Sequence, residues 1–375
     1  MKVRLGIDVA CRAAHQASCA DEAGNVIWAG YRFKTDPADL DALWAKLPAE
    51  RSEVMVIMEP TRNAWAVLAA WFRARGASVV MIPPEQSADL RDYFNKHAKT
   101  DRLDSRILAK VPLLHPDGLH AEAGIGPGEA LKRAVKIRSG LVHRRTTCMA
   151  RLDALLEIGG PGWVGAIGSD MGVTALRFCT RYASPARVKR LGAKRLAEFL
   201  RVSSRGAWNH ERAAEVIAAA EASSALWGPD GIDFEALAED IAVEARLALG
   251  ICEEIKAIDK RIAVLYAQAD PEAIVRSAPG VGVIGAPQIL GRLGDPTRFS
   301  SLSAVRSFSG FVPAQDSSGV HTRAGGPTKA GDTGCRLICA RRELHERHSG
   351  GALHHRHGRG PSSRSRAEPP TCSRL

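Results

Sequence analysis

The stretch VRLGIDV (residues 3–9) is an apolar run that ends at an acidic residue, Asp8. A second run covers residues 14–20, and a third, VIWAGYRF, begins after the polar turn Asp21–Asn25. Short apolar runs separated by Gly, Asn and Asp are typical of antiparallel strands, so this region predicts a hairpin or a three-stranded meander. An acid at the end of a buried strand needs a partner. Asp8 is therefore the first candidate functional residue.

Helices and strands alternate in the next part of the chain. The expected elements are a helix opened by Asp36 and Pro37, a strand at 54–60, a helix at 64–75, a strand at 78–84 and helical structure to about Leu114. Asp is a favoured N-cap and Pro a favoured first helical residue. The order β-β-β-α-β-α-β-α predicts a mixed α/β domain with a central sheet over residues 1–115.

Two long helical patterns dominate the middle of the chain, at residues 128–157 and 234–268. Their length and their apolar spacing predict a helical coiled-coil or oligomerisation segment over residues 116–270. The stretch between them, 159–230, is broken by Gly, Trp and Ser, and its pattern assigns it no role. Residues 271–335 predict a small, mainly helical domain with a Gly/Ser/Thr-rich loop.

The composition is that of a soluble globular protein, with 375 residues of which 45% are hydrophobic and 25% charged. We find no apolar run of 18 residues and no signal peptide, so no membrane association is expected. The net charge of +11 favours a polyanionic partner, although residues 341–375 supply +5 of it through eight arginines against three acids. Eight scattered cysteines predict reduced thiols and a cytoplasmic protein.

Four acidic residues are positioned to converge. Asp8 and Glu59 each end a strand, whereas Asp101 and Asp104 lie three apart in KTDRLDSRIL and share one helix face. Carboxylates gathered in one place repel one another unless cations neutralise them. Mg²⁺ prefers oxygen ligands, and a pair of such ions can activate a nucleophile and stabilise the leaving oxygen in phosphoryl transfer. Taken singly, each acid also suits an ordinary strand end or helix surface.

Three motifs carry a family resemblance: GIDVA at Asp8, MEPT at Glu59, and KTDRLDSRILA at Asp101 and Asp104. Together they resemble the RuvC-like (RNase H-like) domain of DEDD transposases. From about residue 3 to about 332 the chain is similar to insertion-sequence transposases of the one-hundred-and-ten family, which are related to the Piv DNA invertase. GIDVA alone would also suit a sugar kinase or an actin-like ATPase, whereas the four acids in this order are more specific.

The third part of the chain extends the resemblance. RSAPGVGVIGAPQIL (276–290) resembles a helix-hairpin-helix-like stretch whose Pro-Gly-x-Gly turn exposes N–H groups to a phosphate. FSGFVPAQDSSGVHTRAGGPTKAGD (308–332) resembles the family block in which the serine nucleophile precedes a glycine. That serine maps to Ser318, with Ser317 as its neighbour if the register is off by one. Arg323 and Lys329 are placed to meet phosphate oxygens. By itself, the same stretch suits a mobile polar loop.

The resemblance implies a DNA transposase or site-specific recombinase. It implies Mg²⁺ held by Asp8, Glu59, Asp101 and Asp104, and an attack by Ser318 on a DNA phosphodiester that leaves a covalent Ser–DNA intermediate. It also implies a homo-oligomer, a dimer or a tetramer, in which the two catalytic domains meet across subunits. A noncoding bridge RNA would pair with donor and target DNA, which leaves the protein to bind shape and backbone.

Three alternatives remain open from the sequence. An RNase H-like nuclease or Holliday junction resolvase would use the acids without Ser318. A sugar kinase or actin-like ATPase would need a second Gly-rich phosphate loop, which we do not find. A truncated transposase would bind nucleic acid without acting on it.

The composition changes abruptly near Thr333. Residues 336–375 are rich in Arg, Ser, Gly and Pro, which predicts a disordered basic tail. The change also suggests a frame-shifted coding sequence, so that the serine domain would lack its closing helices. Four residues of the types that bind zinc occur in or next to this segment, namely Cys335, Cys339, His345 and His348. The cysteine pair and the histidine pair are too close together for a usual zinc finger, which favours a chance occurrence.

Overall fold

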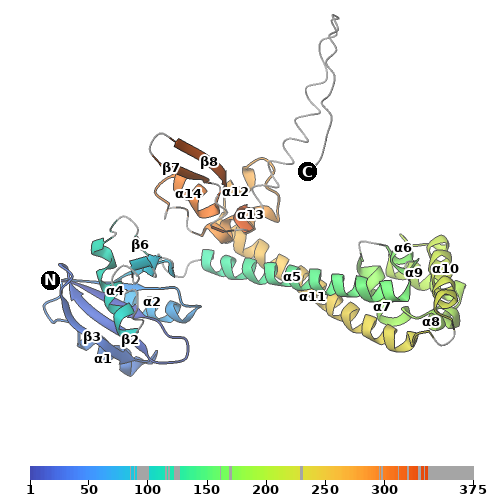
Figure 1. Ribbon diagram of the computed structural model, residues 1–375, viewed down its shortest axis with the longest axis horizontal. Coiled ribbons are helices and arrows are strands. Elements are labelled where there is room, and N and C mark those ends of the chain that lie inside the picture. The colour runs from blue at the N-terminus through green and yellow to red at the C-terminus, as the bar shows by residue number, and fades with distance from the viewer. Residues whose placement is uncertain are drawn as a thin grey trace, which may run out of the picture. The chain divides into compact units, whose positions relative to one another are not determined.

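The computed structural model describes residues 1–84, 86–87, 89–90, 101–114, 116, 119–121, 127–160, 162–168, 171–228, 231–294, 296, 299–310, 312–318, 321–327, 331–332 and 334–336 (Figure 1). The chain forms two compact units. The first comprises Met1–Ala130 with Asp295–Ser300, and the second comprises Leu131–Gly294 with Ser301–Leu375. The division predicted from sequence is finer than this one and stays a prediction.

The first unit is built on a six-stranded mixed sheet in the order β3-β2-β1-β4-β5-β6. Its elements are β1 (Lys2–Asp8), β2 (His15–Asp21), β3 (Val26–Phe33), α1 (Pro37–Ala45), β4 (Glu53–Met58), α2 (Ala64–Ala74), β5 (Ser78–Met81), α4 (Asp101–Leu114) and β6 (His120–Ala121). Strands β1, β4 and β5 are parallel, and β2, β3 and β6 join antiparallel. The meander and the α/β order predicted from sequence are both observed, and the sheet is consistent with an RNase H-like fold.

Local signals explain where helix α1 begins. Asp36 is its N-cap, and the Asp36 carboxylate accepts a hydrogen bond from the Asp39 backbone N–H at 3.1 Å. Pro37 follows in the first turn, where a missing N–H leaves no helical bond unmade. The predicted start of this helix is confirmed.

The two faces of the sheet pack against different helices. On one face, Leu5 and Ile7 of β1 join a buried cluster with Leu43 of α1 and Phe72 of α2. On the other face, Ile57 of β4 packs with α4 residues in a cluster made of Ile57, Val80, Ile82, Leu108 and Val111. Successive residues of a strand alternate between faces. Gly6 therefore belongs to the α4 face, and that glycine decides how closely α4 can approach.

The second unit is almost entirely helical. Its elements are α5 (Pro127–Gly159), α6 (Gly162–Ile167), α7 (Val173–Tyr182), α8 (Pro185–Leu191), α9 (Ala193–Ser203), α10 (His210–Trp227), α11 (Phe234–Ala269), α12 (Ile274–Ser277), α13 (Gly285–Leu293), α14 (Leu302–Ser309), β7 (Pro313–Ser318) and β8 (His321–Pro327). The two long helices predicted from sequence are α5 and α11.

Helices α5 and α11 form an antiparallel pair. Arg138 of α5 forms an ion pair with Asp259 of α11, and Arg151, further along α5, pairs with Glu244, which lies earlier in α11. Because the contacts run in opposite senses along the two helices, their directions are opposed. Whether the pair is a coiled coil that holds subunits together stays a prediction.

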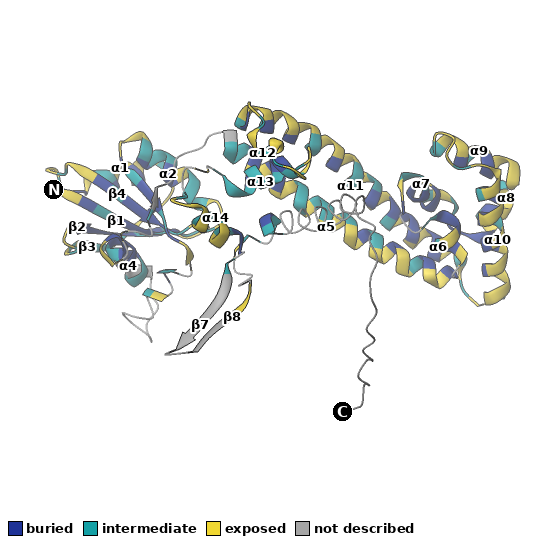
Figure 2. Cartoon of the chain, turned by 90° about the horizontal axis from the view of Figure 1, so that it is seen from above, coloured by how far each residue is buried: buried dark blue, intermediate teal, exposed yellow. Residues whose placement is uncertain are grey.

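The stretch to which the sequence assigns no role, 159–230, folds as helices α6–α10. They bury aromatic and aliphatic side chains against the ends of α5 and α11, in a cluster that includes Trp163, Phe178, Leu200 and Ile241. Figure 2 shows the buried residues of these helices turned inward and a largely exposed outer surface. Among the described residues, this cluster is the largest hydrophobic core of the second unit.

The serine-bearing stretch differs from its prediction. Sequence analysis expects a loop there within a mainly helical domain, whereas β7 and β8 pair as an antiparallel hairpin. Helices α12, α13 and α14 precede the hairpin, as the helical prediction requires. In PAQDSS and HTRAGGP, Thr322 is the one residue of the β-branched or Phe, Tyr and Trp types that favour strands, so the pairing itself defines these strands. In the described part of the chain, no helix combines the length and the apolar character needed to cross a membrane.

Candidate active site

Helix α4 lies across the sheet in the direction opposite to β1. A Cβ atom added at Gly6 would lie 2.2 Å from the backbone oxygen of Ser105, near the start of α4. Gly24 lies in the β2–β3 turn, which is next to the first residues of β1 because Val3 pairs with Asp21. A Cβ added at Gly24 would lie 2.4 Å from the Leu113 side chain, near the end of α4. The first turn of α4 therefore lies toward the end of β1. This is the edge of the sheet at which the predicted acids gather.

Asp8 and Glu59 occupy neighbouring positions at that edge. Strands β1 and β4 are parallel, with Ile7 paired to Met58, and each acid is the next residue along its strand direction. Gly6 lies two residues before Asp8, and Ile57 lies two residues before Glu59. Both belong to the face of the sheet that α4 covers. By alternation, both acids follow on the α4 face.

Helix α4 brings the second pair of acids to the same edge. Asp101 is its first residue and Asp104 lies one turn on, immediately before Ser105. The Ser105 hydroxyl is buried and lies 2.8 Å from the Ser18 hydroxyl of β2, which fixes the start of the helix over the sheet. The side chain of Asp101 is outside the described part of the structure. Asp8, Glu59 and Asp104 are all partly exposed.

The donor set suits a hard cation because all four side chains are carboxylates. Among the described side chains, no group of three or more His, Cys, Asp or Glu lies close enough together to hold a metal ion. The backbone thus brings the four positions to one edge, and the three described carboxylates, those of Asp8, Glu59 and Asp104, do not form a metal-binding group there.

A buried histidine anchors the loop that follows Asp8. His15 Nδ1 accepts a hydrogen bond from the Ala10 backbone N–H at 3.0 Å, and His15 Nε2 lies 2.6 Å from the Thr35 hydroxyl. Because Nδ1 is an acceptor, the imidazole is neutral and Nε2 carries the proton. Burial lowers the pKa of His15 below its usual 6.5. The loop beside Asp8 therefore depends on an uncharged imidazole.

Acidification is expected to loosen this loop. A histidine with a lowered pKa binds a proton more readily in the unfolded chain, so its contribution to stability is complete above pH 6.5 and falls as the pH drops through the lower folded pKa. His15→Asn keeps an acceptor near Ala10 and cannot titrate. We expect it to cost about 1 kcal/mol at pH 7.5 and to flatten the loss of stability between pH 7 and 5, measured by denaturant unfolding. An unchanged pH dependence would exclude His15 as its source.

The candidate nucleophile lies at the end of a strand. Ser318 is the last residue of β7 and pairs with His321, the first residue of β8, while Ser317 pairs with Thr322. Arg323 pairs with Asp316 in the same hairpin. The side chains of these residues, and Lys329 altogether, lie outside the described part of the structure. The backbone thus places Ser318 next to the hairpin connection.

An arginine clamp ties the chain after the hairpin to the helices. Arg292 of α13 donates to both carboxylate oxygens of Asp332, at 2.9 and 3.2 Å, and to the Ser139 hydroxyl of α5 at 3.3 Å. The Asp332 backbone N–H donates to the Phe308 carbonyl at 2.8 Å, and its carboxylate accepts from the Cys335 N–H at 2.7 Å. Asp332 therefore joins α13 to the chain beyond the hairpin through its carboxylate, and joins α14 through its backbone N–H.

Removing the clamp is expected to loosen the end of the serine-bearing stretch. Arg292→Met keeps the aliphatic stem and loses three charge-assisted hydrogen bonds, each of the kind that contributes about 1.5–3 kcal/mol. Hydrogen exchange should quicken in residues 302–310 and 331–336. The matched control is Arg306→Met on the exposed surface of α14, which should leave exchange unchanged. Equal effects of the two variants would contradict a specific role for Arg292.

Sequence reasoning missed Gly6 and Ser105, through which α4 contacts β1 and β2, and Arg292, which binds Asp332. The GIDVA motif contains Gly6, but its need for a glycine arises only when α4 packs on it. Of the four zinc-like residues, Cys335 is buried, and Cys339, His345 and His348 lie outside the described residues.

Comparison with known families assigns the chain. A family model described as "Transposase", of the DEDD type found in IS110, matches residues 5–161, which span the sheet, α4 and α5. A second, described as "Transposase IS116/IS110/IS902 family", matches residues 272–339, which include α13, α14 and the hairpin. Together they cover more than half of the chain. The chain belongs to the IS110 family of transposases.

Relatives of this transposase extend over most of its length. It is 24% identical over 322 residues to the "Insertion element IS116 uncharacterized 44.8 kDa protein" of Streptomyces clavuligerus, which covers 86% of this chain and 78% of the relative. It is 25% identical over 319 residues to the "Insertion element IS110 uncharacterized 43.6 kDa protein" of Streptomyces coelicolor (strain ATCC BAA-471 / A3(2) / M145), which covers 84% and 77%. The resemblance inferred from the motifs is confirmed, and the protein is a transposase whose substrate is DNA.

Proposed function

We propose that this transposase cleaves and rejoins DNA with a metal-binding acidic site and a serine nucleophile. Asp8, Glu59, Asp101 and Asp104 would hold Mg²⁺, and Ser318 would attack the phosphodiester. The observation that carries the proposal is the meeting of β1, β4 and the first turn of α4 at one edge of the sheet. Bound Mg²⁺ would neutralise the carboxylates and offset the charge that develops on the phosphate in phosphoryl transfer.

The serine step conserves the energy of the phosphodiester. A bond forms between Ser318 Oγ and phosphorus while one strand oxygen leaves, and the serine proton passes to solvent or to that oxygen. Rejoining reverses the step, when a strand hydroxyl displaces the serine. Arg323 and Lys329 would hold the phosphate oxygens, Arg as a planar fork and Lys as a point charge. A serine hydroxyl is a weak nucleophile until a base or a metal activates it, which is why both parts are required.

The partners follow from the same proposal. The acids belong to one compact unit and Ser318 to the other, and we propose that the two parts act together in a homo-oligomer, a dimer or a tetramer. A noncoding guide RNA would select the DNA sequence by base pairing, so that the protein contacts backbone and shape. The net charge of +11 is compatible with such polyanionic partners.

The direct test is an adduct assay with the full chain. The protein is incubated with junction-bearing DNA and Mg²⁺, and a denaturing gel separates free protein from a covalent protein–DNA species. We expect an adduct with Mg²⁺ and none with EDTA. Cleaved DNA without an adduct would favour a metal-dependent nuclease or junction resolvase over the serine mechanism.

A truncated, binding-only transposase is the second candidate. The match to the second family model ends at residue 339, so residues 340–375 lie outside both matched ranges. Bound DNA that is neither cleaved nor joined would support this candidate. Translation of the other two reading frames past Thr333 tests the frame-shift hypothesis directly, since absence of a helix-forming sequence there would reject it.

A further inference from the structure

Positive charge is concentrated in one part of the helical bundle. The segment from α7 to just beyond α9, residues 173–205, contains nine Arg or Lys and one acidic residue, Glu198, which gives it a net charge of +8. The whole chain carries +11, of which residues 341–375 supply +5. Outside these two segments the protein is therefore slightly acidic. A charge distribution this uneven marks a surface for a polyanion.

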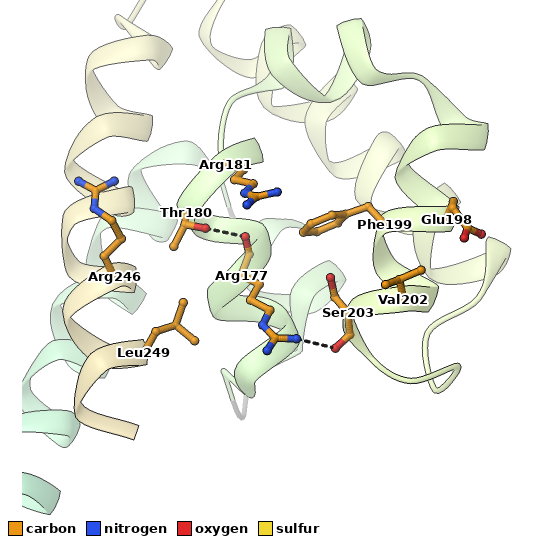
Figure 3. A pocket seen from close by; sticks show the side chains of 9 residues that line it. All are labelled: Arg177, Thr180, Arg181, Glu198, Phe199, Val202, Ser203, Arg246 and Leu249. Carbon is orange, nitrogen blue, oxygen red and sulfur yellow. Dashed lines mark hydrogen bonds between the residues drawn. The ribbon is translucent and has the colours of Figure 1, made fainter. Parts of the chain in front are cut away.

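A pocket opens between this segment and α11. It has a volume of about 720 Å³, in the range of pockets that hold small molecules or single chemical groups. Figure 3 shows that Arg177 and Arg181 project from α7, Phe199 and Val202 line the side formed by α9, and Arg246 lines the side formed by α11. Arginines on two helices thus share a pocket with an aromatic ring.

The arginines of the pocket are available to a ligand. Arg177, Arg181 and Arg246 are exposed, and none forms an ion pair with a carboxylate in the described part of the chain. Among the described residues, the Arg177 side chain donates one long hydrogen bond, 3.4 Å, to the Ser203 carbonyl, and it interacts with Glu253 through charge alone. The carboxylate that lines the pocket, Glu198, is held instead by Arg201 through bonds of 2.8 and 2.9 Å. Three guanidinium groups thus remain to bind oxygens from outside.

The apolar part of the pocket suits a flat aromatic group. Phe199 is half-buried and packs its edge against Tyr182, with ring centroids 4.9 Å apart, so the ring is held in place. Val202 is 62% exposed on the same helix, and Leu249 of α11 lines the opposite wall. Aromatic side chains beside a basic groove are the means by which proteins stack the bases of single strands.

We propose that this pocket binds single-stranded nucleic acid, with phosphates on Arg177, Arg181 and Arg246 and an unstacked base against Phe199. A duplex offers its phosphates but keeps its bases stacked, so it cannot use the aromatic wall. This pocket proposal depends on the proposed function in one respect, which is that the transposase binds nucleic acid. Because binding is measured apart from strand cleavage, failure of the Ser318 mechanism would leave this site standing, and the reverse also holds.

The test measures the binding of labelled 12-mers by fluorescence anisotropy to the full chain, with oligo(U), oligo(dT) and a duplex as separate arms. The pocket variant is Arg177→Gln/Arg181→Gln/Arg246→Gln. The matched control, Lys189→Gln/Lys194→Gln/Arg195→Gln, removes the same charge from exposed positions of the same segment outside the pocket. Phe199→Leu removes the ring and keeps an apolar side chain. Circular dichroism establishes that each variant is folded.

We expect the pocket variant to bind oligo(U) or oligo(dT) roughly tenfold or more weakly than the control variant. The slope of log affinity against log salt should become shallower by about 0.7 for each phosphate that the variant no longer neutralises. Phe199→Leu should weaken single-strand binding by roughly fivefold or more and leave duplex binding unchanged.

The separate arms identify the strand and can overturn the proposal. A tighter complex with oligo(U) than with oligo(dT) would identify the strand as RNA, and the reverse would identify it as DNA. Equally weakened binding in the pocket and control variants, or a preference for the duplex, would overturn the proposal.

Discussion

Ser318→Ala is expected to abolish the covalent protein–DNA species formed with junction-bearing DNA and Mg²⁺. Alanine removes the only atom that would bond to phosphorus, and loss of a nucleophile of this kind lowers the rate by at least about a thousandfold. The readout is the shifted band on a denaturing gel, quantified over time. DNA binding should persist, because the substitution leaves the hairpin backbone, with Ser318 paired to His321, unaltered.

The neighbouring serine supplies the matched control. Positions 317 and 318 alternate between the two faces of a regular strand, so Ser317→Ala should retain the adduct if the motif register is right. An adduct lost in Ser317→Ala and kept in Ser318→Ala would move the nucleophile by one residue. An adduct kept in both single variants would contradict the serine mechanism.

Substitution of one acid tests the metal-binding part of the proposed site separately from the serine. Asp8→Asn conserves the size of the side chain and removes its charge, so a site that needs carboxylates to hold Mg²⁺ should lose the adduct by orders of magnitude. Glu22→Gln removes one charge from an exposed acid of the same unit, in the β2–β3 turn where β1 begins, and should have little effect on the adduct. Equal activity of Asp8→Asn and the wild-type chain would remove Asp8 from the proposed metal site.

The sequence could predict the parts of the site that depend on local patterns. An apolar run followed by an acid marked the ends of β1 and β4, and their parallel pairing from Ile7 to Met58 follows from the α/β order. The N-cap at Asp36 is a signal contained within four residues. Strand ends, caps and long helices are all encoded by neighbours in the chain, and these predictions agree with the structure.

Other features depend on contacts between distant residues and gave no local signal. The hairpin at Ser318 was expected as a loop because its residues have low strand propensity, and only pairing with residues 321–327 makes it a strand. The α6–α10 bundle buries Trp163 and Phe178 at positions whose spacing no single period describes. Its Arg-lined pocket combines α7 with Arg246, which is more than sixty residues away in the chain.

Gly6→Ala should destabilise the first unit by about 3 kcal/mol or more, because the overpacked atoms belong to backbone that cannot turn aside. The new Cβ would lie 2.2 Å from the Ser105 oxygen and 2.4 Å from the Ala109 nitrogen, so α4 would have to move away from β1. That movement also carries Asp101 and Asp104 away from Asp8. We therefore expect faster hydrogen exchange in β1 and α4 together with a loss of adduct formation.

A second change distinguishes this backbone clash from ordinary side-chain crowding. Ser105→Gly removes a side chain and leaves the clashing oxygen in place, so the double variant with Gly6→Ala should be no more stable than Gly6→Ala alone. Gly250→Ala in α11, where an added Cβ meets nothing within 4 Å, should be neutral or stabilising by up to about 1 kcal/mol. Rescue by Ser105→Gly, or a Gly6→Ala protein as stable as the wild-type chain, would mean that α4 does not rest on Gly6. The four acids would then lack the close helix–strand contact that brings them to one edge.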